Sequence, residues 1–317
     1  MTLAPRLVLG TMYFGTRLDD DASFQLLDRF VAAGGRWIDT ANCYAFWESP
    51  SGRGGQSEAV IGRWLTANPG VREQVLISTK VGREKVDPND WDAGVEGQSA
   101  EVVARAIELS LERLQTDHVD LYWAHGEDRE TPDSEQVQAL TDTVVGGLAR
   151  RIGLSNHPAW RAERFRQLAA DLGREGPSAL QNRYTYLQPR AGALRGEEHP
   201  FGVLDAELLD LAAAEGWDVW AYSPLMLGAY DREDRDFPPG YRGEANRARL
   251  AALTEVANEL GVTRGQVVLA WLVGGEQPIW PILGVSSTGQ LDEGLRGVGL
   301  ELTLELSQEH LTRLESA

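Results

Sequence analysis

The sequence predicts an α/β fold in which eight strands and the helices between them close into a (β/α)8 barrel, a TIM barrel with long loops at its C-terminal face. Short apolar runs alternate with segments whose apolar residues recur every three or four positions, a pattern typical of repeated βα units and a parallel sheet. Eight such runs can be counted. An open doubly wound sheet has a similar periodicity, so only the strand count favours closure.

Each strand is predicted from a short run of apolar, often β-branched residues that ends in polar or glycine residues. In chain order, the expected strands cover residues 7–12, 36–40, 75–80, 119–124, 152–156, 179–182, 219–223 and 279–283. Helical periodicity, in several cases after a capping Ser, Thr or Asp, predicts helices over residues 20–33, 57–67, 99–114, 134–148, 160–172, 204–214, 245–260 and 263–273. Residues 41–56 and 225–244 remain as long loops, a length usual for functional segments.

Composition limits the possible functions. A chain of 317 residues that is 42% hydrophobic suffices for one barrel, so residues 1–317 are expected to form a single domain. The net charge of −18 disfavours nucleic acid and anionic membranes as partners, because both attract clustered cations. Cys43 is the only cysteine and the histidines are scattered, so neither a disulfide nor a metal site is expected. Without a signal peptide or a long apolar stretch, a soluble cytoplasmic protein is predicted.

Lys80 is the most informative residue, because every other basic side chain except Lys85 is arginine. Arginine is charged under all ordinary conditions, whereas an ammonium group can be tuned by a neighbour or can tune one. Lys80 ends the third expected strand, Asp39 ends the second, and His125 follows the fourth. Because residues two apart point to the same side of a strand and active sites of such barrels lie at the strand C-termini, these three side chains are expected to meet there.

Tyr44 follows Asp39 by five residues and can fold back over the barrel mouth. A phenol of ordinary pKa, about 10, is a weak acid near neutrality, and an adjacent ammonium such as that of Lys80 is expected to lower this pKa. Asp39 would hold the ammonium, and neutral His125 would donate a hydrogen bond to a carbonyl oxygen. Individually, a buried Asp–Lys pair, a packed loop tyrosine and a core histidine remain open interpretations.

These residues belong to a series of motifs that resembles the aldo-keto reductase superfamily over nearly the whole chain. The motifs are Gly10-Thr11-Met12, Asp39-Thr40-Ala41 with Tyr44, Gln56-Ser57-Glu58, Ser78-Thr79-Lys80, Leu121-Tyr122-Trp123 with His125, Gly153-Leu154-Ser155-Asn156, Gln181-Asn182, Ala221-Tyr222-Ser223-Pro224-Leu225 and Pro281-Ile282-Leu283-Gly284. The resemblance implies a closed barrel and NAD(P)H-dependent reduction of an aldehyde or ketone. It also implies that Tyr44 is the proton donor, that Lys80 and Asp39 tune it, and that His125 orients the carbonyl.

The resemblance implies NADPH/NADP+ as the cofactor, with NADH not excluded. The residues that it assigns to the cofactor are Thr11, Met12, Ser155, Asn156, Gln181, Tyr222, Ser223, Leu225, Gly228, Gly284, Ser286, Ser287, Gln290 and Glu293. A helix beginning near Ser287 would offer backbone amides to phosphate. No glycine-rich dinucleotide motif follows the first strand, so a Rossmann-type site is not indicated.

The chain departs from the family where the adenosine end of the cofactor is expected. Many members carry arginine or lysine near the position of Ser286 and asparagine at that of Gly294, and this chain has neither. A charge-assisted clamp for the 2′-phosphate of NADPH is therefore not evident, although Arg296 is nearby. The preference between NADPH and NADH stays open.

Trp47 and Trp123 are candidate substrate contacts, suited to a sugar face or a ring, and Trp123 is equally a candidate for the barrel core. Two alternative functions remain. The first is a nucleotide-binding regulatory or scaffold barrel with little catalysis. The second is a hydrolase with Asp39 and Glu58 as paired carboxylates, although Glu58 opens a helix where it would favour the helix dipole. A small carbonyl compound is the expected partner, and oligomeric state is unknown from the sequence.

Overall fold

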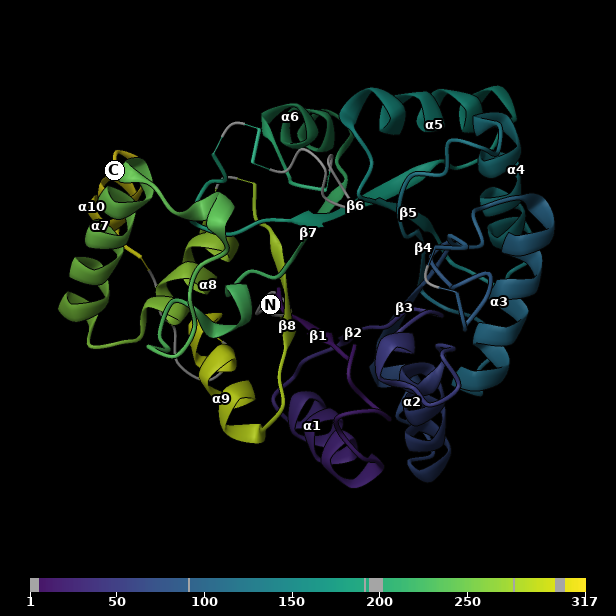
Figure 1. The fold of residues 1–317 in the computed structure, drawn as a ribbon, viewed down its shortest axis with the longest axis horizontal. Coiled ribbons are helices and arrows are strands. Elements are labelled where there is room, and N and C mark those ends of the chain that lie inside the picture. Colours follow the sequence, from purple (N-terminus) through teal and green to yellow (C-terminus); the bar gives the residue numbers. More distant parts are fainter. Residues whose placement is uncertain (1–5, 91, 191, 194–201, 276, 300–305) are drawn as a thin grey trace.

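The computed structural model describes residues 6–90, 92–190, 192–193, 202–275, 277–299 and 306–317. Its strands form one closed parallel barrel in sequence order, in which the first strand pairs with both the second and the last (Figure 1). The predicted closed barrel is therefore confirmed. The strands are β1 (Val8–Gly10), β2 (Trp37–Asp39), β3 (Leu76–Val81), β4 (Leu121–Ala124), β5 (Ile152–Ser155), β6 (Pro177–Arg183), β7 (Asp218–Tyr222) and β8 (Trp280–Gly284).

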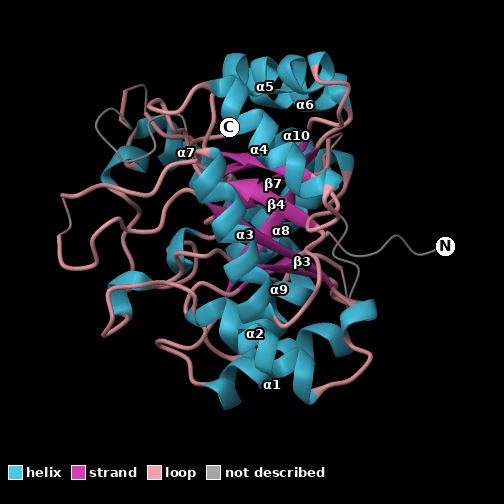
Figure 2. Cartoon of the chain, turned by 90° about the vertical axis from the view of Figure 1, so that its right-hand side faces the viewer, coloured by secondary structure: helices cyan, strands magenta, loops and turns pink. Residues whose placement is uncertain are grey.

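Helices surround the barrel, so the strands lie at the centre of the molecule (Figure 2). They are α1 (Asp20–Ala32), α2 (Gln56–Ala67), α3 (Ala100–Leu114), α4 (Asp133–Val145), α5 (Ala159–Asp171), α6 (Ala206–Glu215), α7 (Glu244–Leu260), α8 (Arg264–Gly274), α9 (Thr288–Gly297) and α10 (Gln308–Glu315). The expected caps are present: the side chains of Asp19, Ser99 and Thr263 accept hydrogen bonds from backbone amides in the first turns of α1, α3 and α8.

Alternation along the strands divides the side chains into two cores. Inside the barrel, Trp220 packs edge-on against Trp37 and Trp123, with ring centroids 4.9 and 5.2 Å apart. Ile77 and Tyr122 point outward into the larger core between strands and helices. The predicted facing of β2, β3 and β4 is thus confirmed. Asp39 lies two residues after Trp37, and Lys80 lies two residues after Ser78. Their side chains therefore point into the barrel at its C-terminal rim.

Several boundaries differ from the sequence prediction. The helix expected over residues 134–148 ends at Val145, because Gly146 and Gly147 follow and Gly147 has a positive φ of 76°. The C-terminal helix α10 was not predicted. It packs against α7 and buries Leu314, whose backbone carbonyl accepts a hydrogen bond from Tyr186 Oη. The segment between β3 and α3, residues 82–99, is a further long connection that the sequence analysis did not single out.

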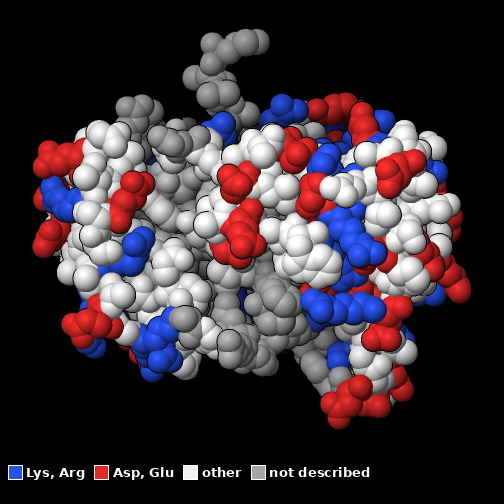
Figure 3. All heavy atoms as spheres, turned by 90° about the horizontal axis from the view of Figure 1, so that it is seen from above, with Lys and Arg blue, Asp and Glu red and all other residues white. Residues whose placement is uncertain are grey.

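The surface carries both charge types. On the face shown in Figure 3, basic side chains lie among acidic ones, over a chain whose net charge is −18. Among the helices that the structure describes, none combines the length and the apolar character that crossing a membrane requires.

Candidate active site

The C-terminal ends of β2, β3 and β4 bring Asp39, Lys80 and His125 together, as the sequence predicted. β2 pairs with β3 through Asp39 and Ser78, and β3 pairs with β4 through Lys80 and Trp123, so the strand ends are in register. Two backbone hydrogen bonds turn the loop after β2 back over these strand ends. The backbone N–H of Asn42 donates to the Lys80 carbonyl at 3.2 Å, and the backbone N–H of Gly55 donates to the Tyr44 carbonyl at 3.2 Å. Tyr44 thereby lies directly against Lys80.

The ammonium group of Lys80 is fully buried and has three acceptors. Its Nζ donates to Asp39 Oδ2 at 2.5 Å, to the Thr40 carbonyl at 2.7 Å and to Tyr44 Oη at 3.1 Å. An ammonium has three N–H bonds, so all of its donors are used. The Thr40 carbonyl is a hydrogen-bond acceptor that the sequence could not predict, because a backbone oxygen leaves no signal in the residue type.

Asp39 is buried as well and is held from three directions. Besides Lys80, Ser78 Oγ donates to Asp39 Oδ1 at 2.6 Å and Gln181 Nε2 donates to the same oxygen at 3.2 Å. Both oxygens of this buried carboxylate therefore have hydrogen-bond donors. The aspartate in turn fixes the position of Lys80.

The expected direction of the Tyr44 pKa shift is wrong for this arrangement. Burial raises the pKa of Tyr44 well above its ordinary value, and the negative charge of Asp39 adds to the rise. Burial also lowers the pKa of Lys80, against the opposing effect of Asp39. The lysine charge is largely matched by Asp39 at 2.5 Å, so little of its field is left to stabilise a phenolate. Tyr44 consequently keeps its proton at neutral pH.

His125 lies next to Tyr44 in an edge-on arrangement, with ring centroids 5.8 Å apart and an interplanar angle of 73°. Its Nδ1 is 3.5 Å from Cys43 Sγ, and its backbone carbonyl accepts from Asn156 Nδ2 at 3.0 Å. Burial raises the pKa of the Cys43 thiol, so it stays protonated. The sequence analysis assigned Cys43 no role, and the structure brings it into contact with the histidine.

Four residues predicted to bind the nicotinamide end lie at the next three strand ends. Tyr222 Oη donates to Asn156 Oδ1 at 2.8 Å, and Asn156 Nδ2 donates to Ser155 Oγ at 3.1 Å. Gln181 donates to Asp39 through its amide nitrogen. Within the described residues this leaves the Ser155 hydroxyl proton as a donor and the Gln181 side-chain oxygen as an acceptor. A carboxamide has one acceptor and two donors, so these residues fit such a group.

The loop after β7 and the start of α9 contain most of the remaining cofactor candidates. Ser223 and Leu227 have positive φ values of 53° and 58°, and Asn156 has one of 59°, a strained conformation that is concentrated at functional sites. Ser287 caps α9 by accepting from the Gln290 amide, and the Gln290 side chain accepts from the Ser286 amide at 2.8 Å. The exposed N-terminus of this helix, next to exposed Gly284, is suited to an anion.

Other predicted contacts are less exposed than their proposed roles suggest. Thr11 is fully buried, and its hydroxyl contacts the Asp39 carbonyl at 2.9 Å and Ser57 Oγ at 2.7 Å, so its side chain joins β1 to β2 and α2. Trp123 is fully buried inside the barrel, which supports the core interpretation over a substrate contact. Trp47 is 39% exposed on the rim loop and packs on Phe46. The remaining candidates are partly buried in the same region: Met12, Leu225, Gly228 and Glu293.

Glu58 lies outside the barrel rather than opposite Asp39. It accepts from Thr79 Oγ1 at 2.6 Å and from Arg113 Nη1 at 3.1 Å. Thr79 neighbours Lys80 on β3 and therefore points to the opposite side of the sheet. The two carboxylates cannot act as a pair, and the hydrolase hypothesis fails on this geometry.

The C-terminal rim of the closed barrel thus joins a protonated tyrosine, a buried lysine, an aspartate and a histidine in one cluster, an arrangement chemically able to exchange a proton with an oxygen atom bound beside it. The model of the Aldo/keto reductase family matches residues 6–317, and the chain belongs to this family. It is an enzyme that acts on carbonyl groups, and the family generally uses NAD(P)H.

Curated relatives are also oxidoreductases. An uncharacterized oxidoreductase of Bacillus subtilis, YrpG, is 31% identical over 308 residues, which cover 95% of this chain and 89% of the relative. A norsolorinic acid reductase of Emericella nidulans is 31% identical over 318 residues, covering 94% and 75% of the two chains. Norsolorinic acid reductase B of Aspergillus parasiticus is 27% identical over 331 residues, covering 98% and 80%.

Proposed function

We propose that this protein reduces an aldehyde or ketone to an alcohol with NADPH, and that Tyr44 gives the proton to the carbonyl oxygen. The single observation that carries the proposal is the hydrogen bond from Lys80 Nζ to Tyr44 Oη at 3.1 Å. Since Lys80 is the donor there, the phenol's own proton is left to point toward a substrate. Tyr44 is only partly buried, so this proton is accessible from the barrel mouth.

His125 would position the substrate carbonyl beside Tyr44. The protonated Cys43 thiol can donate to His125 Nδ1, and that hydrogen bond favours the tautomer with its hydrogen on Nε2. A neutral imidazole with hydrogen on Nε2 is a donor to a carbonyl oxygen. Two donors, Tyr44 and His125, would then converge on one oxygen, which stabilises the negative charge that develops there during reduction.

The cofactor supplies the hydride when bound, and the residues present fit it. Ser155, Asn156 and Gln181 would hold the carboxamide, with Tyr222 beside the ring. The loop residues Ser223, Leu225 and Gly228, together with Gly284, Ser286, Ser287, Gln290 and Glu293, would line the phosphates and adenosine. Arg296 lies in the last turn of α9, away from the Ser287 end, so discrimination of NADPH from NADH is expected to be weak.

For the substrate, we propose a carbonyl compound with a ring or sugar, because Trp47 and Phe46 form an aromatic edge on the rim loop. Two relatives are named norsolorinic acid reductases, which supports a reductase activity. The scaffold alternative is disfavoured, because the tyrosine, lysine, aspartate and histidine all remain and are mutually bonded or in contact.

The test is a titration with NADPH and NADH by tryptophan fluorescence, followed by steady-state assays with aldoses and with aliphatic and aromatic aldehydes and ketones. Cofactor binding and stoichiometric formation of alcohol are expected. Tight cofactor binding without turnover of any class would favour the scaffold alternative. Failure to bind either nucleotide would remove the proposal.

A further inference from the structure

A cavity of about 580 Å³ lies outside the barrel, between α3 and the two loops that follow β2 and β3. It has a size usual for small-molecule sites. None of the residues that line it is among Tyr44, Lys80, Asp39 and His125, so it is separate from the catalytic cluster. It nevertheless shares Asn42, two residues before Tyr44, with the loop that covers the barrel mouth.

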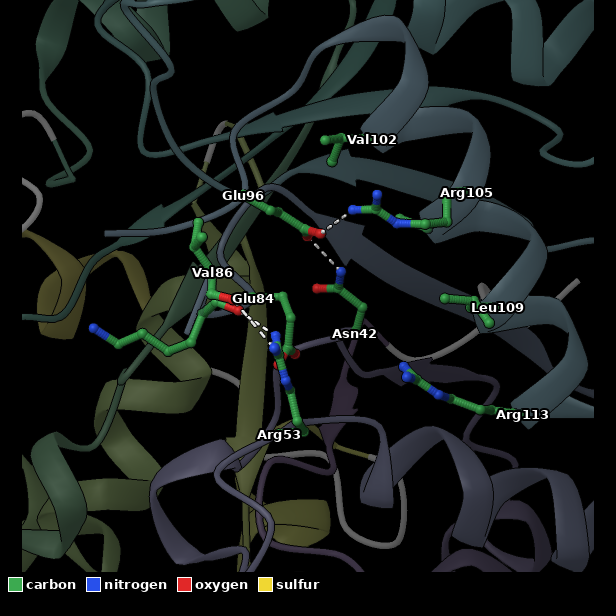
Figure 4. A pocket seen from close by; sticks show the side chains of 11 residues that line it. Asn42, Arg53, Glu84, Val86, Glu96, Val102, Arg105, Leu109 and Arg113 are labelled. Carbon is green, nitrogen blue, oxygen red and sulfur yellow. Dashed lines mark hydrogen bonds and ion pairs between the residues drawn. The ribbon is translucent and has the colours of Figure 1, made fainter. Parts of the chain in front are cut away.

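The α3 wall of this cavity combines cations with apolar surface. Arg105, Leu109 and Arg113 are spaced four residues apart, so they form one stripe along the helix. The side chain of Arg105 is 52% exposed, and within the described residues its only polar contact is a 3.6 Å ion pair with Glu96. Its planar guanidinium therefore has donors available for a bidentate anion. Figure 4 shows the guanidinium groups of Arg53, Arg105 and Arg113 arranged around Asn42.

The charge balance of the lining is opposite to that of the chain. Four cationic side chains, those of Arg53, Lys85, Arg105 and Arg113, line the cavity together with Glu84 and Glu96, and Arg113 is also paired with buried Glu58 at 3.1 Å, in a protein of net charge −18. Burial raises the pKa of Glu84, and the negative charge of nearby Glu96 acts in the same direction. Such a local positive site in an acidic protein attracts small anions.

Asn42 adds a second, independent feature. The residue is 4% exposed and its Nδ2 donates to Glu96 Oε1 at 2.7 Å. Because the Glu96 carboxylate can only accept, this bond fixes which end of the amide is the oxygen. Asn42 Oδ1 is buried and has no hydrogen-bond partner among the described residues. Buried acceptors are nearly always paired, so this atom is available to accept from a bound molecule.

We propose that this cavity, the α3 pocket, binds a small organic anion that also carries a hydroxyl group. The anion pairs with Arg105, the hydroxyl donates to Asn42 Oδ1, and the carbon skeleton packs on Leu109. Hydroxycarboxylates and sugar phosphates both have this chemistry. The inference does not depend on the proposed reductase activity, because it concerns residues outside the catalytic cluster.

Isothermal titration calorimetry of the full chain tests the proposal with gluconate and glucose 6-phosphate as probes. Acetate and inorganic phosphate provide the charge without a hydroxyl on a carbon skeleton, and glycerol provides hydroxyls without the charge. Gluconate, glucose 6-phosphate or both are expected to bind, more tightly than acetate or phosphate, and glycerol is expected not to bind. The stronger of the two probes identifies a carboxylate or a phosphate ligand.

Two variants with matched controls locate the site. Arg105→Gln is expected to weaken binding by about tenfold or more, as loss of a charge-assisted hydrogen bond does. Exposed Arg150, next to the N-terminal end of β5, is the control: Arg150→Gln changes net charge equally and is expected to bind normally. Leu109→Trp, which fills the pocket, is expected to abolish binding, whereas Leu172→Trp on another exposed leucine is expected not to.

Three results would overturn the proposal. The first is that neither gluconate nor glucose 6-phosphate binds. The second is that binding survives in both Arg105→Gln and Leu109→Trp. The third is that saturating NADPH abolishes binding, which would assign the probe to the barrel mouth. Unchanged affinity in the presence of NADPH is the expected result, and it holds whether or not the enzyme turns over a carbonyl substrate.

Discussion

Removal of the Tyr44 hydroxyl is the most direct test of the proton-donor role. Tyr44→Phe retains the ring, whose contacts are with His125 at a centroid distance of 5.8 Å and with the Lys80 ammonium 4.7 Å from the ring centre. Lys80 keeps Asp39 and Thr40 as acceptors and loses only the third one. The substitution therefore removes the reacting proton and one hydrogen bond, and little else.

The two losses have different sizes. A positioned general acid contributes about 10²–10⁴-fold to a rate, which corresponds to about 2.7–5.5 kcal/mol of activation free energy. One lost hydrogen bond costs about 1 kcal/mol of stability. We expect Tyr44→Phe to fold, to bind NADPH as the wild type does, and to lose at least about a hundredfold in the rate of the chemical step.

The assay is a single-turnover reduction that follows the loss of NADPH absorbance, because steady-state kcat can report product release instead of chemistry. Tyr186→Phe is the matched control: its hydroxyl is buried and donates to the Leu314 carbonyl at 2.8 Å, far along the chain in α10. This control is expected to lose similar stability and no activity. A single-turnover rate for Tyr44→Phe within a few-fold of the control would refute the assignment of Tyr44 as the acid.

Three further predictions follow from the same contacts. Because burial raises the pKa of Tyr44, the phenol keeps its proton, and the rate of reduction should stay constant from about pH 6 to about pH 9. Alcohol oxidation needs the phenolate, so its rate should increase as the pH rises. pH profiles of both reactions check this, and a reduction rate that falls across that range contradicts it. Ser286 is exposed beside the start of α9, so Ser286→Arg should place a guanidinium near the 2′-phosphate of NADPH. NADPH binding should tighten by about tenfold, and binding of NADH, which has no 2′-phosphate, should not change. Equal effects on both nucleotides in fluorescence titrations would show that the 2′-phosphate lies elsewhere. Gly153→Ala should lower the free energy of unfolding in urea by about 1–3 kcal/mol, because the added Cβ would lie 2.4 Å from the Trp123 ring. The control Gly274→Ala meets no atom within 4 Å and should leave stability unchanged. Equal stabilities of the two variants would mean that the barrel interior has room to adjust.

The strand ends could be predicted from the sequence because alternation along a strand is a local property. The facing of Asp39 and Lys80 followed from residues two positions earlier, and the register of β2, β3 and β4 then brought them together. Closure was a weaker prediction, since only the count of strands favoured it. Helix α10 was not predicted: its capping box uses His310 at the third position, whereas the usual signal is glutamate or glutamine.

Quantities that depend on burial and on competing partners could not be read from the sequence. The direction of the Tyr44 pKa shift is one, because it depends on how closely Asp39 approaches the lysine and on how little water reaches the phenol. The fate of Trp123 is another, because a tryptophan before His125 suits both the rim and the interior until the packing against Trp220 is known. The α3 pocket is a third, since it joins residues from three separate segments.

The choice of lysine at position 80 follows from the number and direction of its acceptors. Asp39, the Thr40 carbonyl and Tyr44 surround Nζ at 2.5, 2.7 and 3.1 Å in a site with no exposed surface. A compact ammonium with three rotatable donors can satisfy three acceptors around one point, whereas a guanidinium presents five donors in a fixed plane. Arginine here would leave donors unpaired in a buried site and would have no room for its planar head. An otherwise arginine-rich chain therefore uses lysine where its charge has to be buried and its donors have to converge on a tyrosine.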